Sequence, residues 1–398
     1  MKIAVINHRS SVGGWKYLYN LLLAMVKIDS TLQITVLTRD LQDEIGRPYI
    51  EVLNKNGIEV IKFRPNDKIR NKKYFGIKFI DKSINTARLN SIRKKNQSIL
   101  KDFDLIFYSW PYFMEYIDVK VPMFFIPHDF IFTHFFGSHA SECYSRYWNE
   151  RLTNELADFV KNGKAIVSSN YIANEFKRTF PEAKNPNVVY LTVFNNYEKV
   201  KEDYAKEVLK KYGIEGEYIL FANNDMLHKN MPAMVGAFYY IKQKHPNLKL
   251  IITGDKTPIY CKANSPYYWD HVRYDEDYDI KSLGILPDDE FSVILQNAKL
   301  LVNPSLCEAG CGNGIDAWFA EVPTAISEIE PFKNHVEFLN VKTEFFDPRN
   351  SSDIANKIIY LLDNPEVARE NAKISKEAMN KYTWNDVAKQ YLDIFKKG

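Results

Sequence analysis

Short apolar runs alternate with helical patterns along the first half of the chain. Residues 3–6 form an apolar run, and residues 15–26 then carry apolar side chains at helical spacing. Residues 33–38 are a second apolar run, so the three segments predict a strand–helix–strand unit. Further strands are expected at residues 57–63, 105–108, 123–126 and 165–167. Continuous apolar strands that alternate with helices predict a parallel sheet covered on both faces.

The same pattern restarts at residue 218. Apolar runs predict strands at residues 218–222, 249–254, 300–303 and 323–326, and the intervening segments predict helices at residues 231–244, 291–297, 314–320 and 352–362. A second doubly wound α/β domain is therefore expected. The stretch of residues 195–216 between the two patterns is polar and charged, as a linker would be. Residues 383–397 predict one more amphipathic helix.

The length of the chain and the distribution of its charge are consistent with two domains of opposite net charge. The chain has 398 residues, which is typical of two domains. Residues 1–199 hold 29 Lys and Arg against 20 Asp and Glu, whereas residues 200–398 hold 24 against 30. A basic half and an acidic half suggest different partners.

The number of cysteines and the lengths of the apolar runs indicate the cellular compartment that is expected. Four cysteines are too few for a disulfide framework, so a reducing cytoplasm is expected. No apolar run reaches the roughly 18 residues of a membrane-spanning helix. Cys307 and Cys311 have no second ligand pair beside them, and no zinc site is expected there.

The richest candidate site follows the strand predicted at residues 300–303. A loop with three glycines leads into a helix, and carboxylates at Glu308 and Asp316 flank it. Free backbone N–H groups at a helix start bind anions, and glycines let a ligand approach closely. Two carboxylates eight residues apart suit hydroxyl groups at opposite ends of a nucleotide-sugar. The alternative is a glycine-rich turn whose Asp316 serves only the helix dipole.

A second candidate follows the strand predicted at residues 218–222. A polar loop containing Lys229 leads into a helix, with Asn230 as the expected N-cap and Pro232 in the first turn. Lys229 is placed to meet an anion at this helix start. The alternative is a solvated lysine beside a cap.

Two weaker candidates lie in the first half. His128 and Asp129 follow the strand predicted at residues 123–126, and an isolated histidine is more often structural than catalytic. The histidines around His128 fit no tight metal-ligand spacing, so no metal is expected. Gly13 and Gly14 follow the first strand, but they do not form the G-x-G-x-x-G pattern of a dinucleotide dehydrogenase. A tight strand-to-helix turn explains them equally well.

These motifs together resemble the retaining glycosyltransferases of glycosyltransferase family 4. Glu308 and Asp316 resemble the family's Glu-x7-Glu signature, and Asn303-Pro304-Ser305 resembles the entry to it. His128-Asp129 and the Lys229-Asn230 helix start also match family elements. Three positions depart from the pattern: Asp316 replaces a glutamate, Glu321 replaces a usual glycine, and Asn224 stands where the family often has an arginine.

The resemblance implies a GT-B fold of two Rossmann-like domains. Residues 1–197 would bind the acceptor, residues 198–380 would bind the nucleotide-sugar, and a helix in residues 381–398 would cross back to the first domain. The catalytic residues that the resemblance implies are His128, Lys229 and Glu308. Glu308 would hold sugar hydroxyls, Lys229 would offset the charge on the leaving diphosphate, and His128 would lie near the anomeric carbon or the sugar 6-position. Asp316 would hold the ribose. The other donor-binding positions that the resemblance implies are Gly13, Gly14, Asn224, Lys229, Ile285, Gly310, Cys311 and Gly312.

The activity that the resemblance implies is metal-independent transfer of a hexosyl or deoxyhexosyl group with retention of configuration. The donor would be a GDP-, UDP- or dTDP-sugar, and no cofactor is expected. The acceptor would be a saccharide or a lipid-linked saccharide in the synthesis of a surface polysaccharide, lipopolysaccharide or capsule at the cytoplasmic face of the membrane. Two alternatives stay open: a nucleotide-sugar epimerase or phosphorylase of the same fold, and a non-catalytic sugar-nucleotide-binding protein.

A basic, aromatic stretch remains outside these motifs. Residues 62–101 contain 13 Lys and Arg but only two acids, with aromatic side chains among them. A solvated helical face explains this composition, and so does contact with an anionic membrane surface or a phosphorylated lipid acceptor. In a glycosyltransferase the second interpretation is favoured. Nucleic acid is not expected, because no recognised binding module accompanies the charge.

Overall fold

The computed structural model describes residues 1–7, 12–63, 78–112, 114, 116–134, 146–195, 197–224, 226–255, 257 and 279–398. Within these residues the chain divides into two compact units. The first unit comprises the described residues up to Leu191 together with Trp384–Gly398, and the second comprises those in Thr192–Thr383.

The first unit is built on a parallel sheet. Its described strands, in the order β3-β2-β1-β4-β5-β6-β7, pair in parallel throughout. The four residues of β4 are all buried, as the continuous apolar runs predict. Its elements are β1 (Lys2–Asn7), α1 (Val12–Ile28), β2 (Gln33–Thr38), α2 (Arg47–Lys55), β3 (Glu59–Lys62), α3 (Lys78–Leu100), β4 (Leu105–Tyr108), β5 (Met123–Phe125), α4 (Ile131–His134), α5 (Arg146–Asn162), β6 (Lys164–Val167), α6 (Asn170–Thr179), β7 (Asn187–Val188) and α14 (Trp384–Lys396).

The second unit repeats the architecture. Its parallel sheet has the order β10-β9-β8-β11-β12-β13 over the described strands. Its elements are α7 (Glu202–Lys211), β8 (Tyr218–Ala222), η2 (Leu227–Lys229), α8 (Met231–Lys244), β9 (Lys249–Thr253), β10 (Ile280–Gly284), α9 (Asp288–Gln296), β11 (Leu301–Asn303), α10 (Gly312–Phe319), β12 (Thr324–Ser327), α11 (Glu330–Leu339), β13 (Glu344–Phe346), α12 (Ser351–Asp363) and α13 (Pro365–Met379).

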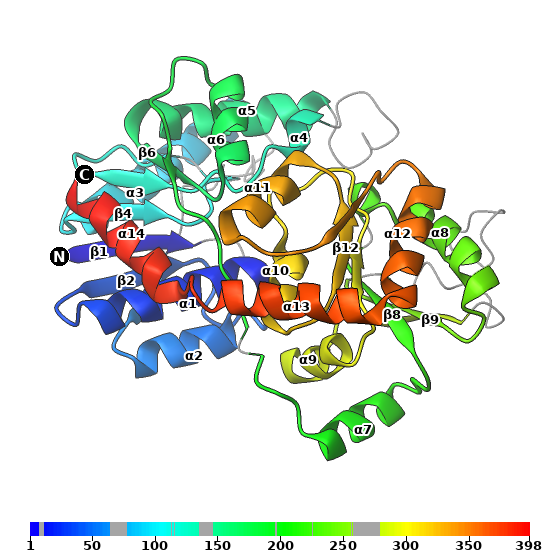
Figure 1. The fold of residues 1–398 in the computed structure, drawn as a ribbon. Helices are drawn as coiled ribbons and strands as arrows, with labels where there is room; N and C mark the ends of the chain where they lie inside the picture. Colours follow the sequence, from blue (N-terminus) through cyan, green and yellow to red (C-terminus); the bar gives the residue numbers. More distant parts are fainter. Residues whose placement is uncertain are drawn as a thin grey trace. The chain divides into compact units, whose positions relative to one another are not determined.

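Two apolar clusters cover the faces of the second sheet. Helices α8 and α12 lie side by side in Figure 1, and their buried side chains pack on one face with Ile219, Leu250 and Val302. The other face packs against α7 and α9 through Leu220, Ile251 and residues of both helices. Burial of both faces leaves the ends of the strands as the place where polar groups can meet a ligand.

The last helix, α14, belongs to the first unit. Its apolar face buries Val387, Tyr391, Leu392 and Phe395, and it lies along α1. The hydroxyls of Tyr17 and Tyr391 are hydrogen-bonded to each other, which ties the two helices together. Figure 1 shows α14 beside α1, although the two helices are far apart in the sequence.

The interpretation of residues 195–216 as a linker is wrong for its central part. Residues Glu202–Lys211 form α7, and Ala205 and Val208 are buried in the second apolar cluster. Two of the ten residues are fully buried, and Tyr204 and Leu209 pack partly buried against the same cluster. The six exposed residues, all Lys, Glu or Asp, gave the segment its charged, linker-like composition. The amphipathic pattern is short and was masked by Lys and Glu on the solvent face.

Gly13 and Gly14 do not lie in a loop as predicted, because α1 begins at Val12 and includes both of them. Several short elements at the edges of the sheets were not predicted either, among them β7, β10 and β13. These edge strands are only partly buried, so their side chains are not uniformly apolar. Among the described residues, no helix combines the length and the apolar character needed to cross a membrane.

Candidate functional site

The polar residues of the second unit gather where the strand order of its sheet reverses. Strands β8 and β11 are neighbours, and the chain continues outward from β8 to β9 on one side and from β11 to β12 on the other. In open α/β sheets such a switch point leaves a crevice beyond the carboxyl ends of the strands. Lys229 follows β8, and Glu308 follows β11. The fold therefore brings together two motifs that are 79 residues apart.

Lys229 and Glu308 form an ion pair at this point. Lys229 Nζ lies 2.5 Å from Glu308 Oε1, and the two side chains are 16% and 12% exposed. Ser305 Oγ lies 2.8 Å from the same carboxylate oxygen. A short, largely buried ion pair with an additional hydroxyl donor is held in one geometry. It presents one cation and one anion side by side at the edge of the sheet.

A network of asparagine side chains supports this pair from below. Asn303 Oδ1 accepts hydrogen bonds from Asn223 Nδ2 at 3.3 Å and from the backbone N–H of Ser305 at 3.3 Å. Asn303 Nδ2 donates to Asn313 Oδ1 at 2.6 Å, and Asn313 Nδ2 donates to the carbonyl of Ala222 at 2.8 Å. The network joins the ends of β8 and β11 to the first turn of α10. Because Asn303 is buried and hydrogen-bonded on both sides of its amide, the network holds the strand ends that carry the charged groups.

Sequence reasoning missed this network. Asn303 and Asn223 each stand at the end of an apolar strand, and that placement of an amide was the available signal. Asn303 is only 1% exposed. A buried amide at a strand end needs partners, and these come from segments that lie far apart in the sequence.

Asn230 has a different role from the predicted N-cap. Its backbone is left-handed, with φ of 64°, and its side chain makes no capping hydrogen bond. Instead, Asn230 Nδ2 donates to the carbonyls of Pro304 and Pro348, at 3.0 and 2.7 Å. Asparagine tolerates the left-handed region better than most residues. The residue thus joins the loop after β8 to the loop after β11.

His228 adds no charge to the site. It is 7% exposed, and burial lowers its pKa to about 4, although the charge of Glu308 opposes that shift. Its carbonyl accepts a hydrogen bond from the backbone N–H of Leu306 at 2.7 Å. At neutral pH His228 is therefore a neutral structural neighbour of Lys229.

The three glycines of the loop after Glu308 have different surroundings. A Cβ atom at Gly310 would lie 2.8 Å from the buried ring of His335, and one at Gly314 would lie 2.3 Å from Cys311 Sγ. At Gly312, the first residue of α10, a Cβ atom would meet nothing within 4 Å. Gly310 and Gly314 are thus needed for packing, whereas Gly312 faces open space at a helix start. Cys311 is buried, and burial raises the pKa of its thiol, so it stays protonated.

Asp316 lies one turn further along α10. Burial, together with the negative charge of Asp316, raises the pKa of the Tyr197 hydroxyl. Asn224 is exposed, and its Oδ1 accepts a hydrogen bond from the backbone N–H of Met226 at 3.2 Å. Ile285, after β10, is 68% exposed.

His128 lies in the first unit, after β5. Its Nε2 is 2.5 Å from the carbonyl oxygen of Ser109, and its ring stacks on Trp110 at a centroid distance of 4.5 Å. Tyr17 meets the histidine ring edge-on at 6.0 Å. Burial lowers the pKa of His128 to about 4, so the imidazole is neutral at physiological pH. Gly13, in the first turn of α1, has no atom within 4 Å of where a Cβ would stand.

The predicted residues thus fall into two groups. Lys229, Glu308, Gly310, Cys311, Gly312 and Asp316 are in the second unit, together with Asn224 and Ile285, and His128, Gly13 and Gly14 are in the first. Over the described part of the chain, no group of three or more His, Cys, Asp or Glu side chains is arranged to hold a metal ion.

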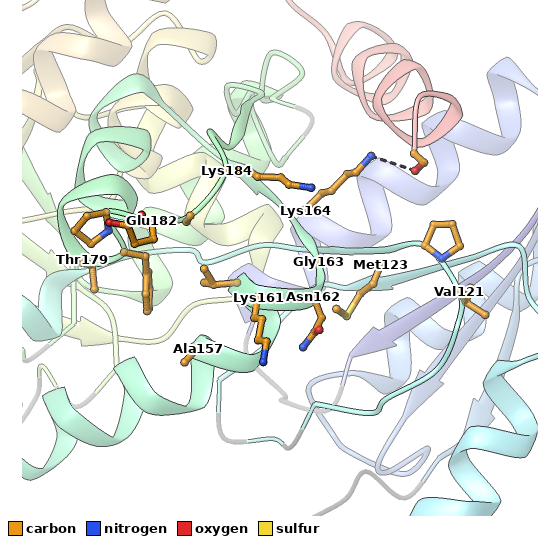
Figure 2. A pocket seen from close by; sticks show the side chains of 16 residues that line it. Val121, Met123, Ala157, Lys161, Asn162, Gly163, Lys164, Thr179, Glu182 and Lys184 are labelled. Atoms are coloured by element: carbon orange, nitrogen blue, oxygen red, sulfur yellow. Dashed lines mark hydrogen bonds between the residues drawn. The ribbon is translucent and has the colours of Figure 1, made fainter.

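A separate cavity of about 730 Å³ lies in the first unit. Figure 2 shows Met123, Gly163 and Lys164 along it, and these residues stand at the amino ends of β5 and β6. Lys164 Nζ donates to the carbonyl of Gly398 at 3.1 Å. The cavity is therefore at the opposite end of the strands from His128, and it is not part of the candidate site.

Comparison with known proteins finds a family likeness over most of the second unit. The family model described as Glycosyl transferases group 1 matches residues 205–381, which include Lys229, Glu308 and Asp316. A 105-residue segment is 27% identical to the α-1,3/1,6-mannosyltransferase ALG2 of Yarrowia lipolytica. That match covers 26% of this chain and 22% of the length of the relative.

Solved structures resemble the whole chain. The Anabaena protein HepE, crystallised with UDP and glucose, has a TM-score of 0.70 at 14% identity, with 100% of both chains covered. WaaG, a glycosyltransferase involved in lipopolysaccharide biosynthesis, has a TM-score of 0.67 at 12% identity over 100% of both chains. A glycosyltransferase of Rickettsia africae has a TM-score of 0.64 at 14% identity, covering 100% of this chain and 98% of the other. The predicted GT-B fold, two Rossmann-like α/β domains, is confirmed.

Proposed function

We propose that the protein is a retaining glycosyltransferase that transfers a sugar from a nucleotide-diphosphate sugar to a saccharide or lipid-linked acceptor. One observation carries the proposal: Lys229 and Glu308 pair at the switch point of the second sheet, next to the open start of α10. This places a cation, free helix N–H groups and a hydrogen-bonding carboxylate at the edge where an anionic sugar donor would bind.

Donor binding would exchange the partner of Lys229. The diphosphate competes with Glu308 for the ammonium group, and the N–H groups of Gly310, Cys311 and Gly312 donate to the remaining phosphate oxygens. Glu308, once separated from Lys229, accepts hydrogen bonds from sugar hydroxyls. The paired state therefore keeps both groups in place until the donor arrives.

The reaction would follow from this arrangement without a covalent intermediate. The bond between the anomeric carbon and the β-phosphate oxygen breaks, while the acceptor hydroxyl forms a bond to the same carbon from the same face. The hydroxyl proton passes to the departing phosphate oxygen. Lys229 and the helix N–H groups stabilise the charge that develops on the diphosphate, which is the largest contribution such sites make. No metal or cofactor is part of the proposal.

His128 would serve as a neutral hydrogen-bond acceptor. The carbonyl of Ser109 only accepts, so the proton of the neutral ring is on Nε2, and Nδ1 has the free lone pair. A sugar hydroxyl, such as one at the 6-position, can donate to Nδ1. Gly13 and Gly14 would admit the donor at the start of α1.

The acceptor side would lie in the first unit, and we place the enzyme at the cytoplasmic face of the membrane. The basic stretch of residues 62–101 motivates this, although residues 64–77 lie outside the described part of the chain. Arg93, Lys94 and Lys95 are on α3. Cosedimentation with anionic vesicles should weaken when these three are replaced by Ser and when salt is raised. Wild-type protein that stays in the supernatant with anionic vesicles would remove the membrane from the proposal.

A second candidate is a sugar-nucleotide-binding protein without transfer activity. Asn224 favours it, because this exposed amide stands where a second cation would strengthen diphosphate binding. Such a protein would bind a donor but release neither free nucleotide nor a new glycoside.

Two measurements test the proposal. Thermal unfolding with GDP, UDP, dTDP and ADP identifies the nucleotide, since a ligand at 100 times its dissociation constant adds about 2.7 kcal/mol of stability. The matching sugar donors, UDP-glucose first because HepE was crystallised with it, are then incubated with acceptor saccharides. Proton NMR of the product reads the anomeric configuration. A product of inverted configuration would contradict the retaining mechanism, and absence of nucleotide binding would contradict the function.

A further inference from the structure

Asn7 is the last residue of β1, at the point where the strand order of the first sheet reverses. Strands β1 and β4 are neighbours, and the chain continues outward from β1 to β2 on one side and from β4 to β5 on the other. The first sheet therefore has a switch point of its own, and ligands of open α/β sheets bind beyond the carboxyl ends of the strands at such a point. None of the candidate motifs includes Asn7.

The Asn7 side chain is buried, but only one side of its amide is hydrogen-bonded. The residue is 3% exposed. Its Oδ1 accepts a hydrogen bond from Ser109 Oγ at 3.0 Å, whereas its Nδ2 has no hydrogen-bond partner among the described residues. A buried donor without a partner costs free energy, and native structures hold few such groups. The location of this donor at a switch point indicates that its partner is a ligand.

Ser109 holds both Asn7 and His128. It directly follows β4 and is 4% exposed, and its hydroxyl lies 3.2 Å from the carbonyl oxygen of Ile6 as well as 3.0 Å from Asn7 Oδ1. The Ser109 carbonyl accepts from His128 Nε2 at 2.5 Å, which leaves His128 Nδ1 as an acceptor. One residue thus anchors a donor, Asn7 Nδ2, and an acceptor, His128 Nδ1.

We propose that Asn7 is a saccharide-binding residue whose Nδ2 donates a hydrogen bond to a sugar hydroxyl oxygen, and that Ser109 is its positioning residue. The inference rests on the proposed function, because it names a residue that would recognise the saccharide. A hydroxyl both accepts and donates hydrogen bonds, so hydroxyls of one sugar can accept from Asn7 and donate to His128. A fully ionised phosphate group could accept from Asn7 but has no proton for His128.

Three variants and a control test this. Asn7→Leu replaces the amide by an apolar group of similar size, and Ser109 keeps the Ile6 carbonyl as a partner. Asn7→Asp keeps the acceptor for Ser109 but replaces the donor by an acceptor oxygen. Ser109→Ala removes the hydroxyl that orients the amide. Thr38→Val is the matched control, because Thr38 is also buried, at the carboxyl end of β2, on the side of β1 away from β4.

Ligand titration and transfer kinetics show which sugar Asn7 meets. UDP and UDP-glucose are the first ligands, or the matching pair for the nucleotide that the wild-type protein binds. For a sugar of the donor, Asn7→Leu should lose about tenfold in affinity for the nucleotide-sugar and less than twofold for the nucleotide. For a sugar of the acceptor, the acceptor KM should rise about tenfold and both affinities should stay unchanged. Either result supports the inference.

The other variants should follow the same ligand. Asn7→Asp should lose at least as much as Asn7→Leu, because two acceptors then face each other only through the sugar hydroxyl. Ser109→Ala should lose about threefold, since its amide is present but less well oriented. Thr38→Val should change neither affinity nor KM. Thermal unfolding without ligand adds a second readout: Asn7→Leu should unfold at a temperature equal to or above that of the wild-type protein, because it removes an unpaired buried donor.

Three results would overturn the inference. If the wild-type protein binds and transfers a sugar but Asn7→Leu leaves the affinities and the acceptor KM unchanged, Asn7 meets no sugar, and the proposed function stands. A lower unfolding temperature in Asn7→Leu, with equal losses for nucleotide, nucleotide-sugar and acceptor, assigns Asn7 a structural role only. If the wild-type protein binds no nucleotide-sugar or transfers no sugar, the proposed function fails and this inference fails with it.

Discussion

The two sheets have the same architecture, but different side chains lie at their carboxyl ends: charged groups in the second unit and a neutral histidine among aromatic rings in the first. In the second unit, Lys229, Glu308 and a set of hydrogen-bonded amides lie at the switch point. In the first unit, a neutral His128 is enclosed by Trp110 and Tyr17. Both sheets are parallel and doubly wound. The fold thus provides two equivalent edges, and the side chains placed there decide which one can bind an anion.

The largest expected effect on activity is at the Lys229–Glu308 pair, at the carboxyl end of the second sheet. Glu308→Ala should lower turnover on the preferred donor by at least about 100-fold, because contacts to the sugar matter most in the transition state. Glu308→Gln keeps the shape and should recover part of the loss. Steady-state kinetics of the purified variants measure this, with circular dichroism to confirm folding. Near-normal turnover in Glu308→Ala would place the reaction elsewhere.

Lys229→Ala should weaken nucleoside diphosphate binding by about 30-fold, or about 2 kcal/mol, because it removes a charge-assisted contact. Binding of the nucleoside without phosphates should change by less than threefold. Titration calorimetry with both ligands gives the ratio. Lys299→Ala is the matched control, since its ion pair with Glu217 is exposed and lies at the amino ends of β8 and β11, opposite the carboxyl ends where Lys229 and Glu308 meet. Equal losses for both ligands would mean that Lys229 does not meet the phosphates.

His128→Asn tests whether the carboxyl end of the first sheet, where His128 contacts Trp110 and Tyr17, contributes to sugar recognition. The variant should lose about tenfold in kcat/KM with a donor that has a 6-hydroxyl, the value expected for one hydrogen bond of about 1.4 kcal/mol. With the 6-deoxy donor it should lose little. A similar loss with both donors would assign His128 a packing role within the Trp110 and Tyr17 shell.

Acid should destabilise the second unit more than the first. Burial lowers the pKa of His128, His228 and His335 to about 4, against 6.5 for the free side chain. Below pH 6.5 the unfolded chain binds protons that the folded chain does not, so stability is lost as pH falls toward 4. The loss is about 1.4 kcal/mol per histidine at pH 5.5, and the second unit holds two of the three.

Hydrogen exchange at pH 7.5 and 5.5, corrected for intrinsic rates, separates the two units. Peptides from the second unit should lose more protection than those from the first. His335→Asn should reduce the pH dependence in the second unit alone. Equal losses in both units would mean that the buried histidines do not dominate the acid response.

The smallest expected effect on binding is at Gly312, and it distinguishes this glycine from Gly310 in the same loop. Gly312→Ala should weaken nucleoside diphosphate binding about threefold and leave stability unchanged, because its surroundings are open. Gly310→Ala should cost about 1–3 kcal/mol of stability, because the new methyl group would meet the buried His335 ring. Thermal unfolding and nucleotide titration of both variants check this. A stability loss in Gly312→Ala would show that its open space is needed for folding rather than for a ligand.

The strands that form the centre of each sheet were predictable from the sequence, because strands buried on both faces read as continuous apolar runs. Strand β4 and the segment of β8 are examples. The α7 helix was not predictable in the same way, since only Ala205 and Val208 are fully buried, with Tyr204 and Leu209 partly buried beside them. Short edge strands such as β7 and β13 were not predicted, because their pairing with a neighbouring strand defines them rather than their composition.

The sequence by itself determined the kinds of group at the site. Lys229, Glu308 and Asp316 stand out because charged residues directly follow apolar strands or a glycine loop. Tertiary structure decided which groups contact one another: the Lys229–Glu308 pair and the Asn230 bridge to Pro304 and Pro348. The reason is physical. A strand end can be recognised locally, but the partners of a buried polar group come from distant segments that only the parallel pairing of the strands brings to one edge.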